Sequence, residues 1–465
     1  MIPLLLANFN YLDDLGRVAI GYRQWSDYSR YVSEYGSVLL HAGTYLTDIS
    51  PLPQMIAAVF MAVAGVAAIC CLKKEDVPSI SVLDIAAVLP LALSPYFLEC
   101  LSYKYDAPYM AFSVLASILP VLVYRYRGTG RLFCLASVLG MLLMCLSYQA
   151  SSGIYPMLIV FTAFSLWNRG EVKEALRLAG QAVLCYLAGL LIFRFACMPD
   201  VDSYVSTSIL PLPQLIPGFF AQLIRYVQLI LADFKKIWLL LIAILSLLFV
   251  AVSVRDSKQN RILAFFVSAG VLALAFALAF GVYPALAIAL EEPRAMFGFG
   301  AWIAFVAVSA AGAKKANVVR LCALALSWCF FTFTLTYGNA LIEQKCFAES
   351  RIQLVLQDLN DLKQMNDGNF RVVSVSGDIG HAPVVAKIPG SRHILSRLIP
   401  TLFSGNDWGE NYIYCYYGIK NIAMLEDGSY LLDKVDITKL DLPVLKDTMF
   451  HTIRGDSQCL VIDLK

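Results

Sequence analysis

The stretch that decides the fold class is IWLLLIAILSLLFVAVSV, residues 237–254, in which no residue carries a charge. A helix of that length nearly spans the hydrocarbon core of a bilayer, which is about 30 Å thick, at a rise of about 1.5 Å per residue. Other apolar runs of helical length lie at about 55–72, 80–98, 107–124, 132–150, 153–167, 178–198, 262–282, 297–313 and 321–339. The sequence therefore predicts a polytopic α-helical membrane protein with about 10 spans.

The composition supports this class and excludes three others. The chain of 465 residues is 59% hydrophobic and 15% charged, whereas a soluble domain carries about 25% charged residues. Its net charge of +2 gives no support for nucleic-acid binding. The four histidines are scattered, and no cysteine–histidine spacing resembles a zinc site. We therefore exclude a soluble enzyme, a nucleic-acid-binding protein and a zinc protein.

The connectors between the apolar runs alternate in charge. One set contains 14 basic residues and comprises 73–79, 125–131, 168–177, 255–261 and 314–320. The other set, which comprises 99–106, 151–152, 199–218 and 283–296, contains only Lys104 and Arg294. The positive-inside rule places the first set in the cytoplasm and the second on the outer side. Residues 10–54 and 340–465 then also lie on the outer side.

Two segments do not fit a series of ten regular spans. Residues 1–9, MIPLLLANF, are too short to span a bilayer and lack the basic region of a signal peptide. We favour a missing first span, which would make eleven, over a re-entrant segment at 1–9. Within 199–236, a proline-rich loop precedes FFAQLIRYVQLILADFKK (219–236), where Arg225 and Asp233 interrupt an apolar helical pattern. That pattern predicts an amphipathic helix along the outer interface.

The chain from residue 340 onward predicts a small α/β domain. LIEQKCFAESRIQLVLQDLNDLKQM (341–365) is typical of a charged helix that leaves the membrane, and SRHILSRLIPTL (391–402) of a second helix. FRVVSVSG (370–377), SYLLD (429–433) and QCLVIDLK (458–465) are typical of strands. We therefore divide the chain into 1–54, a transmembrane domain at 55–339, and 340–465. Among Cys346, Cys415 and Cys459, one pair could form a disulfide on an oxidising side.

Adjacent carboxylates lie in the first outer segment, directly after an apolar stretch. They are Asp13 and Asp14, and Arg17 follows one helical turn later. Paired carboxylates at a membrane surface can act as a general base or hold a divalent cation, so metal dependence stays open. The alternative is that Asp13 only caps a helix.

Other outer segments also gather charged and aromatic side chains. Arg17, Arg23 and Arg30 could bind phosphate by charge-assisted hydrogen bonds, and Trp25 suits a sugar face or a membrane interface. Two further clusters are SPYFLECLSYKYDAPYM (94–110), with Glu99, Tyr103, Lys104 and Asp106, and ALEEPRAMFGFG (289–300), with Glu291, Glu292 and Arg294. Charged groups this close to hydrocarbon are costly unless they are paired or functional. An ion pair of Arg294 with Glu291 or Glu292 is the alternative to a functional role.

These stretches resemble a known family. The similar blocks are NYLDDLGR (10–17), GYRQW (21–25), DISPLPQ (48–54), SPYFLECLSYKYDAP (94–108), EEPR (291–294) and PVLKDTMFHTI (443–453). They resemble the serotype-converting O-antigen glucosyltransferases, the type II glucosyltransferase family of bacteria and their phages. The resemblance covers essentially the whole chain and departs from it at the start, where relatives have a full first span.

The resemblance implies a GT-C-like fold in the bacterial inner membrane, with the active site on the periplasmic side. It implies that glucose moves from undecaprenyl-phosphate-glucose to a sugar of lipid-linked O-antigen. It also implies two functional partners, a small flippase and a separate glucosyltransferase that makes the donor. Such enzymes place an acidic residue in the first outer loop as the catalytic base, which indicates Asp13, with Asp14 in support or holding a cation.

The remaining site residues follow from the expected substrates. A lipid-phosphate leaving group needs a cation near the interface, and the candidates are Arg17, Lys104 and Arg294. For substrate binding we expect Trp25, Glu99, Tyr103, Asp106 and Glu292. The alternative function is a transporter or flippase of a polyisoprenoid-linked glycan, which would carry charges within its spans. Only Asp84 and Arg194 are so placed in the sequence.

Overall fold

A computed structural model of the chain describes all residues except 74–79, 199–207, 313–315, 365–371, 389–391, 404–440 and 458. Contacts divide it into two units. The first, here called the helical unit, comprises residue 1, 24–40 and 50–336. The second, here called the α/β unit, comprises 2–23, 41–49 and 337–465. The predicted N-terminal segment 1–54 is thus shared between the units, whereas the change near 337 lies close to the predicted boundary at 340.

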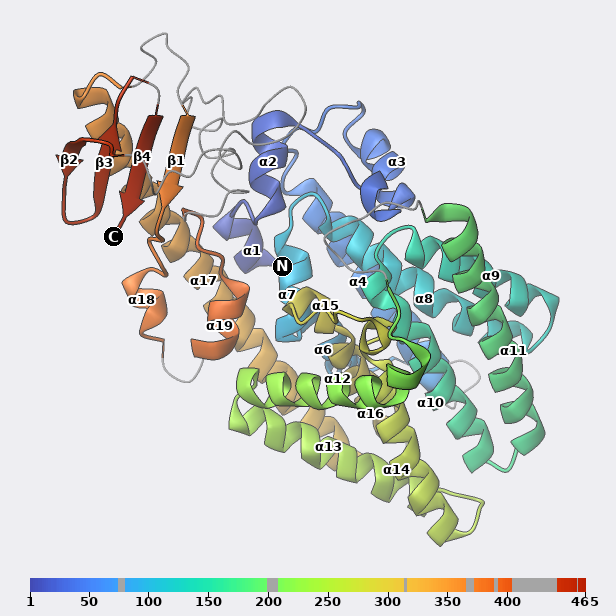
Figure 1. The fold of residues 1–465 in the computed structure, drawn as a ribbon. Helices are drawn as coiled ribbons and strands as arrows, with labels where there is room; N and C mark the ends of the chain where they lie inside the picture. The colour runs from blue at the N-terminus through green and yellow to red at the C-terminus, as the bar shows by residue number, and fades with distance from the viewer. Residues whose placement is uncertain are drawn as a thin grey trace. The chain divides into compact units, whose positions relative to one another are not determined.

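The described helices are long and apolar enough for a polytopic membrane protein, as predicted (Figure 1). Nine pass this test by length and composition, or up to ten if a bent pair described below is one span. The nine are α4 (Leu52–Leu72), α8 (Ala107–Arg127), η2–α10 (Gln149–Asn168), α11–η3 (Val172–Cys197), α12 (Leu212–Asp233), α13 (Lys236–Arg255), α14 (Arg261–Leu278), α15–α16 (Pro293–Ala311) and α17 (Asn317–Asp361). The run predicted at 132–150 forms a shorter helix, α9 (Arg131–Cys145).

The span predicted at 80–98 is not one continuous helix, because prolines break it into three helices. They are α5 (Val82–Val88), α6 (Pro90–Leu93) and α7 (Pro95–Ser102), with a bend of 62° between 82–93 and 95–102. Proline lacks the N–H that continues a helix but suits its first turn, so Pro90 and Pro95 each begin a new helix. The Ser94 side chain caps α7 by accepting a hydrogen bond from the Phe97 N–H. Glu99, expected in a loop, therefore lies within α7.

Asp84 lies in the first turn of α5. Its carboxylate accepts a hydrogen bond from the Ser81 backbone N–H at 2.8 Å, and Ser81 caps α5 in return. Lys73 at the end of α4 forms an ion pair with the same carboxylate at 2.9 Å. A pair of opposite charges whose hydrogen bonds are satisfied can serve a structural role, and here it connects the end of α4 to the start of α5. Asp84 therefore needs no transport path to explain it.

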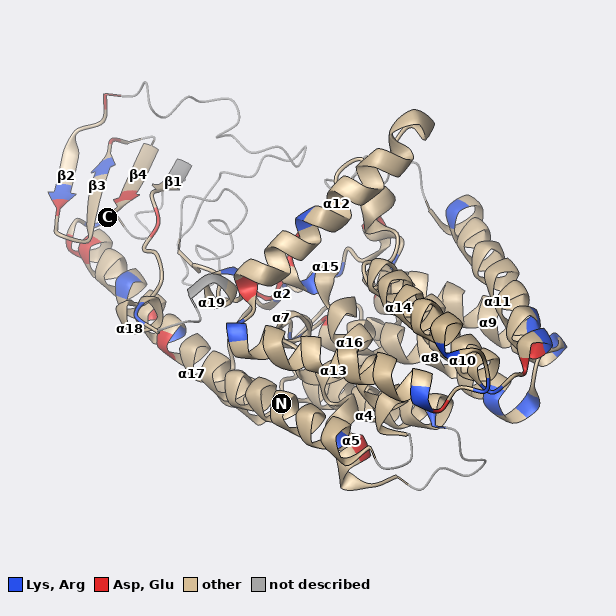
Figure 2. Ribbon diagram, turned by 90° about the horizontal axis from the view of Figure 1, so that it is seen from below, with Lys and Arg blue, Asp and Glu red and all other residues tan. Residues whose placement is uncertain are grey.

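Contacts sort the connectors into the same two groups as their charge. In the basic group, the Lys258 N–H donates to the Asn168 carbonyl, and the Thr129 hydroxyl donates to Glu174. In the other group, the Leu210 N–H donates to the Ala285 carbonyl. Figure 2 shows basic residues gathered at helix ends, with largely uncharged helix between them. The alternation that carries the topology prediction is thus present in the helical unit.

Helix α12 passes the length test for a span, but its contacts favour the interfacial position that the sequence predicts. It begins at Leu212, earlier than the predicted 219. Arg225 in its middle pairs with Glu291, and the Tyr226 hydroxyl donates to the Leu290 carbonyl. At its last residue, Asp233 accepts a hydrogen bond from the Tyr96 hydroxyl of α7. Its middle contacts the 283–296 connector, and its end contacts α7 just before the 99–106 connector. The sequence predicts that both connectors lie on the outer side.

The α/β unit contains a four-stranded sheet of order β1-β4-β3-β2. Its strands are β1 (Val372–Ser376), β2 (Val444–Asp447), β3 (His451–Gly455) and β4 (Cys459–Leu464), with β1 parallel to β4 and the other pairs antiparallel. Apolar residues of α17, including Ile352, Val355 and Leu359, share a buried cluster with Ile453 and Ile462 of the sheet. The sheet is therefore stabilised by packing on the second half of α17.

Sequence patterns predicted part of this unit correctly. The strands expected at 370–377 and 458–465 are β1 and β4, and the helix expected at 391–402 is α19 (Arg392–Leu398). The predicted charged helix is the continuation of α17, which runs for 45 residues without a break. Strands β2 and β3 and the short α18 (Pro383–Ala386) were not predicted. The strand predicted at 429–433 lies outside the described residues.

No disulfide joins the cysteines of this unit that the structure describes. Cys346 is an exposed free thiol and Cys459 is a half-buried one. Cys415 lies outside the described residues. The disulfide that the sequence left open is therefore not formed by Cys346 or Cys459.

Candidate functional site

A basic side chain and a buried carboxylate meet where α7 faces α15 (Pro293–Met296). The Arg294 backbone N–H donates to Glu99 Oε2 at 2.6 Å, and Arg294 Nη1 lies 3.5 Å from Glu99 Oε1. The same nitrogen donates to the Tyr103 hydroxyl. The Glu99 side chain is 4% exposed, whereas that of Arg294 is 26% exposed. Glu99 therefore fixes the position of a guanidinium that still reaches solvent.

The close approach of helices at this place depends on glycine. Gly300 of α16 (Gly298–Ala311) lies against the side chain of Ser94 and the carbonyl of Pro90, so a Cβ there would collide with both. Ser94 and Pro90 form the break that starts α7. The bend in the 82–102 segment and the absence of a side chain at Gly300 thus together place Glu99 beside Arg294.

A second pair of predicted residues meets beside α8. Trp25 Nε1 donates to Asp106 Oδ1 at 2.5 Å, and the Trp25 backbone N–H donates to Glu34 Oε2 at 3.0 Å. The Trp25 ring packs edge-on against Tyr109, with centroids 5.7 Å apart. Trp25 is 1% exposed, which leaves no ring face open to a sugar. In this arrangement Trp25 holds Asp106 and is not the stacking platform that its sequence position suggested.

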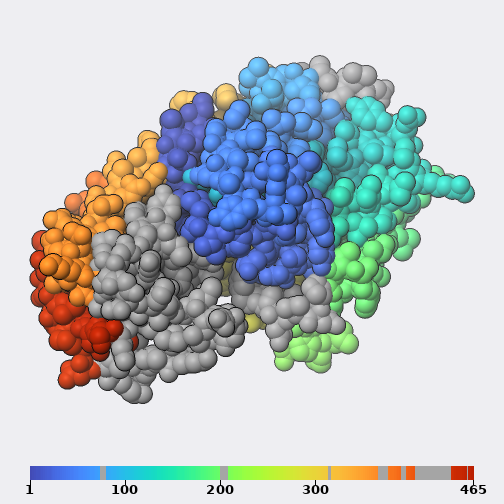
Figure 3. All heavy atoms as spheres, turned by 90° about the horizontal axis from the view of Figure 1, so that it is seen from above, coloured from blue at the N-terminus to red at the C-terminus, as the bar shows by residue number. Residues whose placement is uncertain are grey.

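Arg30 is one of three basic residues, with Arg17 and Arg23, in the predicted first outer segment. It directly precedes α3 (Tyr31–Leu40), and its Nε donates to Gln149 Oε1 at 3.2 Å. Its guanidinium lies over the ring of Tyr148, 4.8 Å from the centroid. Hydrogen bonds from Val32 N–H to the Leu146 carbonyl and from Ser33 to the Ser147 carbonyl hold α3 against this segment. Figure 3 shows a blue surface next to a cyan one, in keeping with these contacts between an early and a later segment of the helical unit.

The Arg30 and Arg294 groups adjoin each other through tyrosines. The Tyr148 hydroxyl donates to the Arg294 carbonyl at 3.3 Å, on the residue whose ring Arg30 covers. Burial raises the pKa of Tyr283 to about 12, and the charges of Arg30 and Arg294 both act to lower it. Tyr283 therefore stays a neutral hydroxyl at physiological pH, close to two guanidinium groups.

The predicted acids lie in the α/β unit, at the start of α2 (Asp13–Ile20). Asp14 is fully buried, and its Oδ2 accepts a hydrogen bond from the Tyr11 N–H at 3.0 Å. Asp13 is half-buried. The residue before the helix is Leu12 and makes no side-chain cap, so the interpretation of Asp13 as a capping residue is wrong. Arg17, one turn on, is 4% exposed.

The structure corrects the expected partners of Arg294. Glu291 pairs with Arg225 through two hydrogen bonds of 3.0 and 3.1 Å, and Glu292 is exposed. The partner of Arg294 is Glu99, a residue 195 positions away. Lys104 is 3% exposed. The polar stretch that contains Tyr148 and Gln149 went unnoticed because the apolar run predicted at 132–150 included it.

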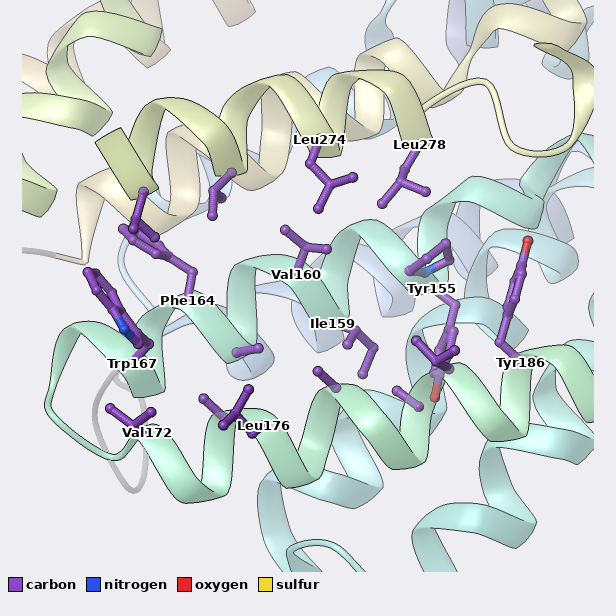
Figure 4. A pocket seen from close by; sticks show the side chains of 18 of the residues that line it. Tyr155, Ile159, Val160, Phe164, Trp167, Val172, Leu176, Tyr186, Leu274 and Leu278 are labelled. Atoms are coloured by element: carbon purple, nitrogen blue, oxygen red, sulfur yellow. The ribbon is translucent and has the colours of Figure 1, made fainter. Parts of the chain in front are cut away.

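An apolar groove of about 560 Å³ lies between α10 (Ile154–Asn168), α11 (Val172–Ile192) and α14 (Figure 4). Trp167 and Val172 lie at one end, and Tyr155 and Tyr186 lie at the other. The Tyr186 hydroxyl donates to the Ser152 carbonyl at 3.0 Å. Ser152 belongs to η2 (Gln149–Gly153), the element whose first residue binds Arg30. One end of the groove therefore adjoins η2, whose Gln149 binds Arg30.

Across the described ranges, no group of three or more histidine, cysteine, aspartate or glutamate side chains is arranged to hold a metal ion. The described candidate site within the helical unit thus consists of guanidinium groups, tyrosine hydroxyls and the buried carboxylates of Glu99 and Asp106. Groups of this kind bind phosphate and hydroxyl-rich ligands through charge-assisted and neutral hydrogen bonds.

Comparison with known proteins agrees with the resemblance drawn from the sequence. A protein of Salmonella phage P22, described as an uncharacterised 55.3 kDa protein in the gtrB 5′ region, is 29% identical over 196 residues. The match covers 42% of this chain and 38% of that protein, so it spans less than half of the relative. No solved structure matches the chain significantly. The family described as Glucosyl transferase GtrII matches residues 2–311, and the chain therefore belongs to the GtrII glucosyltransferase family.

Proposed function

We propose that the chain transfers a glucosyl residue from undecaprenyl-phosphate-glucose to a sugar of lipid-linked O-antigen at the periplasmic face of the bacterial inner membrane. Family membership supports the glucosyl transfer. The observation that carries the donor class is the cluster of Arg294, Tyr103 and Glu99, built where α7 ends beside α15. A phosphate attached to a membrane-embedded chain lies at such helix ends. A GT-C-like fold is part of this proposal.

Arg294 contacts the donor phosphate in this proposal. A guanidinium offers parallel donors to phosphate oxygens and keeps its proton at any physiological pH. Charge builds up on the phosphate as the bond to glucose breaks, and a fixed cation stabilises that charge in the transition state. Lys104 or Arg17 is the second contact in this proposal, and Tyr103, Asp106 and Glu292 contribute to substrate binding.

The acceptor hydroxyl is deprotonated by Asp13. Its half-buried carboxylate makes no hydrogen bond with any described residue, so its lone pairs are available to take a proton. Asp14 supports it through the hydrogen bond that fixes the start of α2, or holds a divalent cation. Attack by the activated hydroxyl on the anomeric carbon, with polyprenyl phosphate leaving, is a base-assisted and, in the simplest case, inverting displacement.

The apolar groove between α10, α11 and α14 suits the isoprenoid chain of the donor. Its walls are aliphatic and aromatic over its length, and a chain of repeated isoprene units gains free energy by leaving water for such a surface. The further partners in this proposal are a small flippase and a glucosyltransferase that makes the lipid-linked donor.

One assay separates glucosyl transfer from transport of a polyisoprenoid-linked glycan. Purified protein is incubated with undecaprenyl-phosphate-glucose and lipid-linked O-antigen acceptor, and released polyprenyl phosphate and glucosylated acceptor are measured. Transfer predicts that both products appear in equal amounts. Movement of the intact donor across a vesicle membrane, without either product, would contradict the proposal and support the flippase.

A further inference from the structure

Arg30 differs from Arg294 and Arg225 because it forms no ion pair with a carboxylate among the described residues. Its Nε is bound to the uncharged Gln149, and its guanidinium lies against the rings of Tyr148 and Tyr28, at 4.8 and 5.3 Å. Its two terminal nitrogens make no hydrogen bond or ion pair with any residue in the described part of the chain. The side chain is half-buried. The guanidinium of Arg30 is thus held in place, and both of its terminal nitrogens can donate hydrogen bonds to a ligand.

Its neighbours show the contrast. Arg294 is paired with Glu99, and Arg225 is paired with Glu291 through two hydrogen bonds. An aromatic ring attracts a cation through its quadrupole, but it carries no net charge. The positive charge of Arg30 is therefore uncompensated. Because the site is half-buried, that charge is less screened than at an exposed surface.

Gln149 and Tyr28 hold this geometry in place. Gln149 Nε2 donates to the Tyr28 carbonyl at 2.9 Å while its Oε1 accepts from Arg30, so one amide ties the arginine to the turn before it. Tyr148 connects this group to Arg294, because the Tyr148 hydroxyl donates to the Arg294 carbonyl. Arg30 and Arg294 consequently flank the same tyrosine.

We propose that Arg30 is the principal phosphate-binding residue of this site, with its two terminal nitrogens donating in parallel to two oxygens of a phosphate ester of an isoprenoid alcohol. The inference rests on the proposed function for the identity of that ester. Arg294, whose charge Glu99 offsets, then has the smaller share in holding the phosphate. The fixed fork of Arg30 matches the spacing of two phosphate oxygens, which a single ammonium group cannot do.

The test measures binding of farnesyl phosphate to the purified full-length protein in nanodiscs by isothermal titration calorimetry. Farnesol and inorganic phosphate are the comparison ligands. Arg30→Gln should weaken farnesyl phosphate binding roughly 10- to 100-fold, the usual range for a charge-assisted contact. Farnesol binding should not change. Arg225→Gln, which removes an arginine already paired with Glu291, is the matched control and should bind farnesyl phosphate as the wild type does.

A second substitution tests the charge without removing the arginine. Gln149→Glu places a carboxylate beside Arg30 Nε and loses the amide donor to the Tyr28 carbonyl. Because the carboxylate offsets the charge of Arg30, the variant should weaken farnesyl phosphate binding at least about fivefold. Thermal unfolding of each variant reports on folding. If Arg30→Gln does not fold, Gln149→Glu and Arg30→Lys decide the question, because both keep a long side chain packed on Tyr148.

Unchanged farnesyl phosphate affinity in the folded Arg30→Gln or Gln149→Glu variant would overturn the proposal. So would inorganic phosphate that binds as tightly as farnesyl phosphate, since the site would then not recognise a lipid ester. The transfer assay separates this inference from the proposed function. If Arg30→Gln transfers glucose with an unchanged KM for the donor, the inference about Arg30 is wrong but the proposed function stands. If farnesyl phosphate binding depends on Arg30 but the wild type transfers no glucose, the proposed function is wrong but the inference about Arg30 stands.

Discussion

Arg294 could bind the donor phosphate or only form an ion pair with Glu99, and its contacts predict the effect of replacing it with lysine. Its side chain serves Glu99 and Tyr103, and its guanidinium also lies 5.4 Å from the Tyr103 ring centroid. An ammonium group could keep the ion pair with Glu99. It could not also supply parallel donors to a phosphate or stack flat on the ring.

Arg294→Lys should therefore fold normally and lose roughly 10- to 100-fold in kcat/KM for the lipid-phosphate donor. The measurement is the transfer rate over a range of donor concentrations, with thermal unfolding as the folding control. If the activity of Arg294→Lys stays within about twofold of the wild type, Arg294 serves only the ion pair with Glu99 and has no part in binding donor.

Asp13 and Asp14 should respond differently to replacement by asparagine. Asparagine has nearly the same shape as aspartate but is no base. In Asp14→Asn its side-chain oxygen can still accept from the Tyr11 N–H, so α2 should start as before. Asp13→Asn should lower the transfer rate by a factor on the order of 10² to 10⁴, the range for loss of a general base. Near-full activity in both variants, measured as glucosylated acceptor, would refute the assignment.

His451 should make the stability of the α/β unit depend on pH. Burial lowers the pKa of His451 below its usual 6.5, more than its 2.9 Å contact with Asp358 raises it, so the folded protein keeps the ring neutral near pH 7. The unfolded chain takes up a proton below about pH 6.5, and stability is therefore lost as the pH falls from there toward the folded pKa. Asp447, whose pKa Lys465 lowers, adds its own loss only below about pH 3.8.

The expected observation is weaker amide-exchange protection of β3 and β4 at pH 5 than at pH 7, after correction for intrinsic exchange rates. His451→Gln should flatten this dependence, because glutamine has no proton to gain. An equal pH dependence in wild type and variant would show that another group is responsible.

At the residue scale, the sequence identified the charged groups better than their partners. Glu99, Tyr103 and Arg294 were all selected, because charge beside hydrocarbon is costly and asks for a reason. That Glu99 would pair with Arg294 depends on the bend at Pro95 and on Gly300, and no local pattern encodes a contact 195 positions apart. In the sequence nothing distinguishes Arg30 from Arg23 as a phosphate ligand. The contacts of Arg30 with Gln149 and Tyr148 in the structure distinguish it.

At the scale of elements, hydropathy located most of the helices but not their breaks. The run at 80–98 is uncharged apart from Asp84 and mostly apolar, so an average over the window hides Pro90 and Pro95. Each proline removes a helical hydrogen bond, and the resulting bend moves Glu99 from a presumed loop into α7. Strands β2 and β3 were not predicted, because VLKD and HTIRG are short and their polar residues obscure an apolar alternation.

The groove between α10, α11 and α14 makes a prediction about chain length. Ala179→Phe fills part of it, since Ala179 is among the residues that line it. Displacing even two methylene groups costs about tenfold in affinity. The KM for undecaprenyl-phosphate-glucose should therefore rise about tenfold, while a donor with only two isoprene units should be used as before.

The control is Ala273→Phe, the same substitution at an exposed position of α14 outside the groove. It should change neither KM. Equal effects of Ala179→Phe on the long and the short donor would place the isoprenoid chain elsewhere.

At the scale of the whole molecule, alternation of charge was the most informative pattern. It needs only the order of the connectors, and the hydrogen bonds among 125–131, 168–177 and 255–261 group them as the charges do. The division into units was harder to foresee. Residues 2–23 pack with the chain beyond 337, through contacts such as Tyr11 Oη to the Leu398 carbonyl. Such pairings depend on tertiary packing and leave no periodicity in the sequence.

The sidedness that this alternation implies can be tested with a cysteine already in the chain. Cys346 is exposed in the α/β unit, whereas the other described cysteines are buried or half-buried. If residues 340–465 face the periplasm, a membrane-impermeant maleimide should label Cys346 in intact spheroplasts, and Cys346→Ser should abolish that label. Lys258→Cys, in a basic connector and exposed, should become reactive only after the membrane is permeabilised. Fourteen basic residues favour this orientation. If position 258 is labelled in sealed spheroplasts and Cys346 is protected, the positive-inside rule fails for this chain.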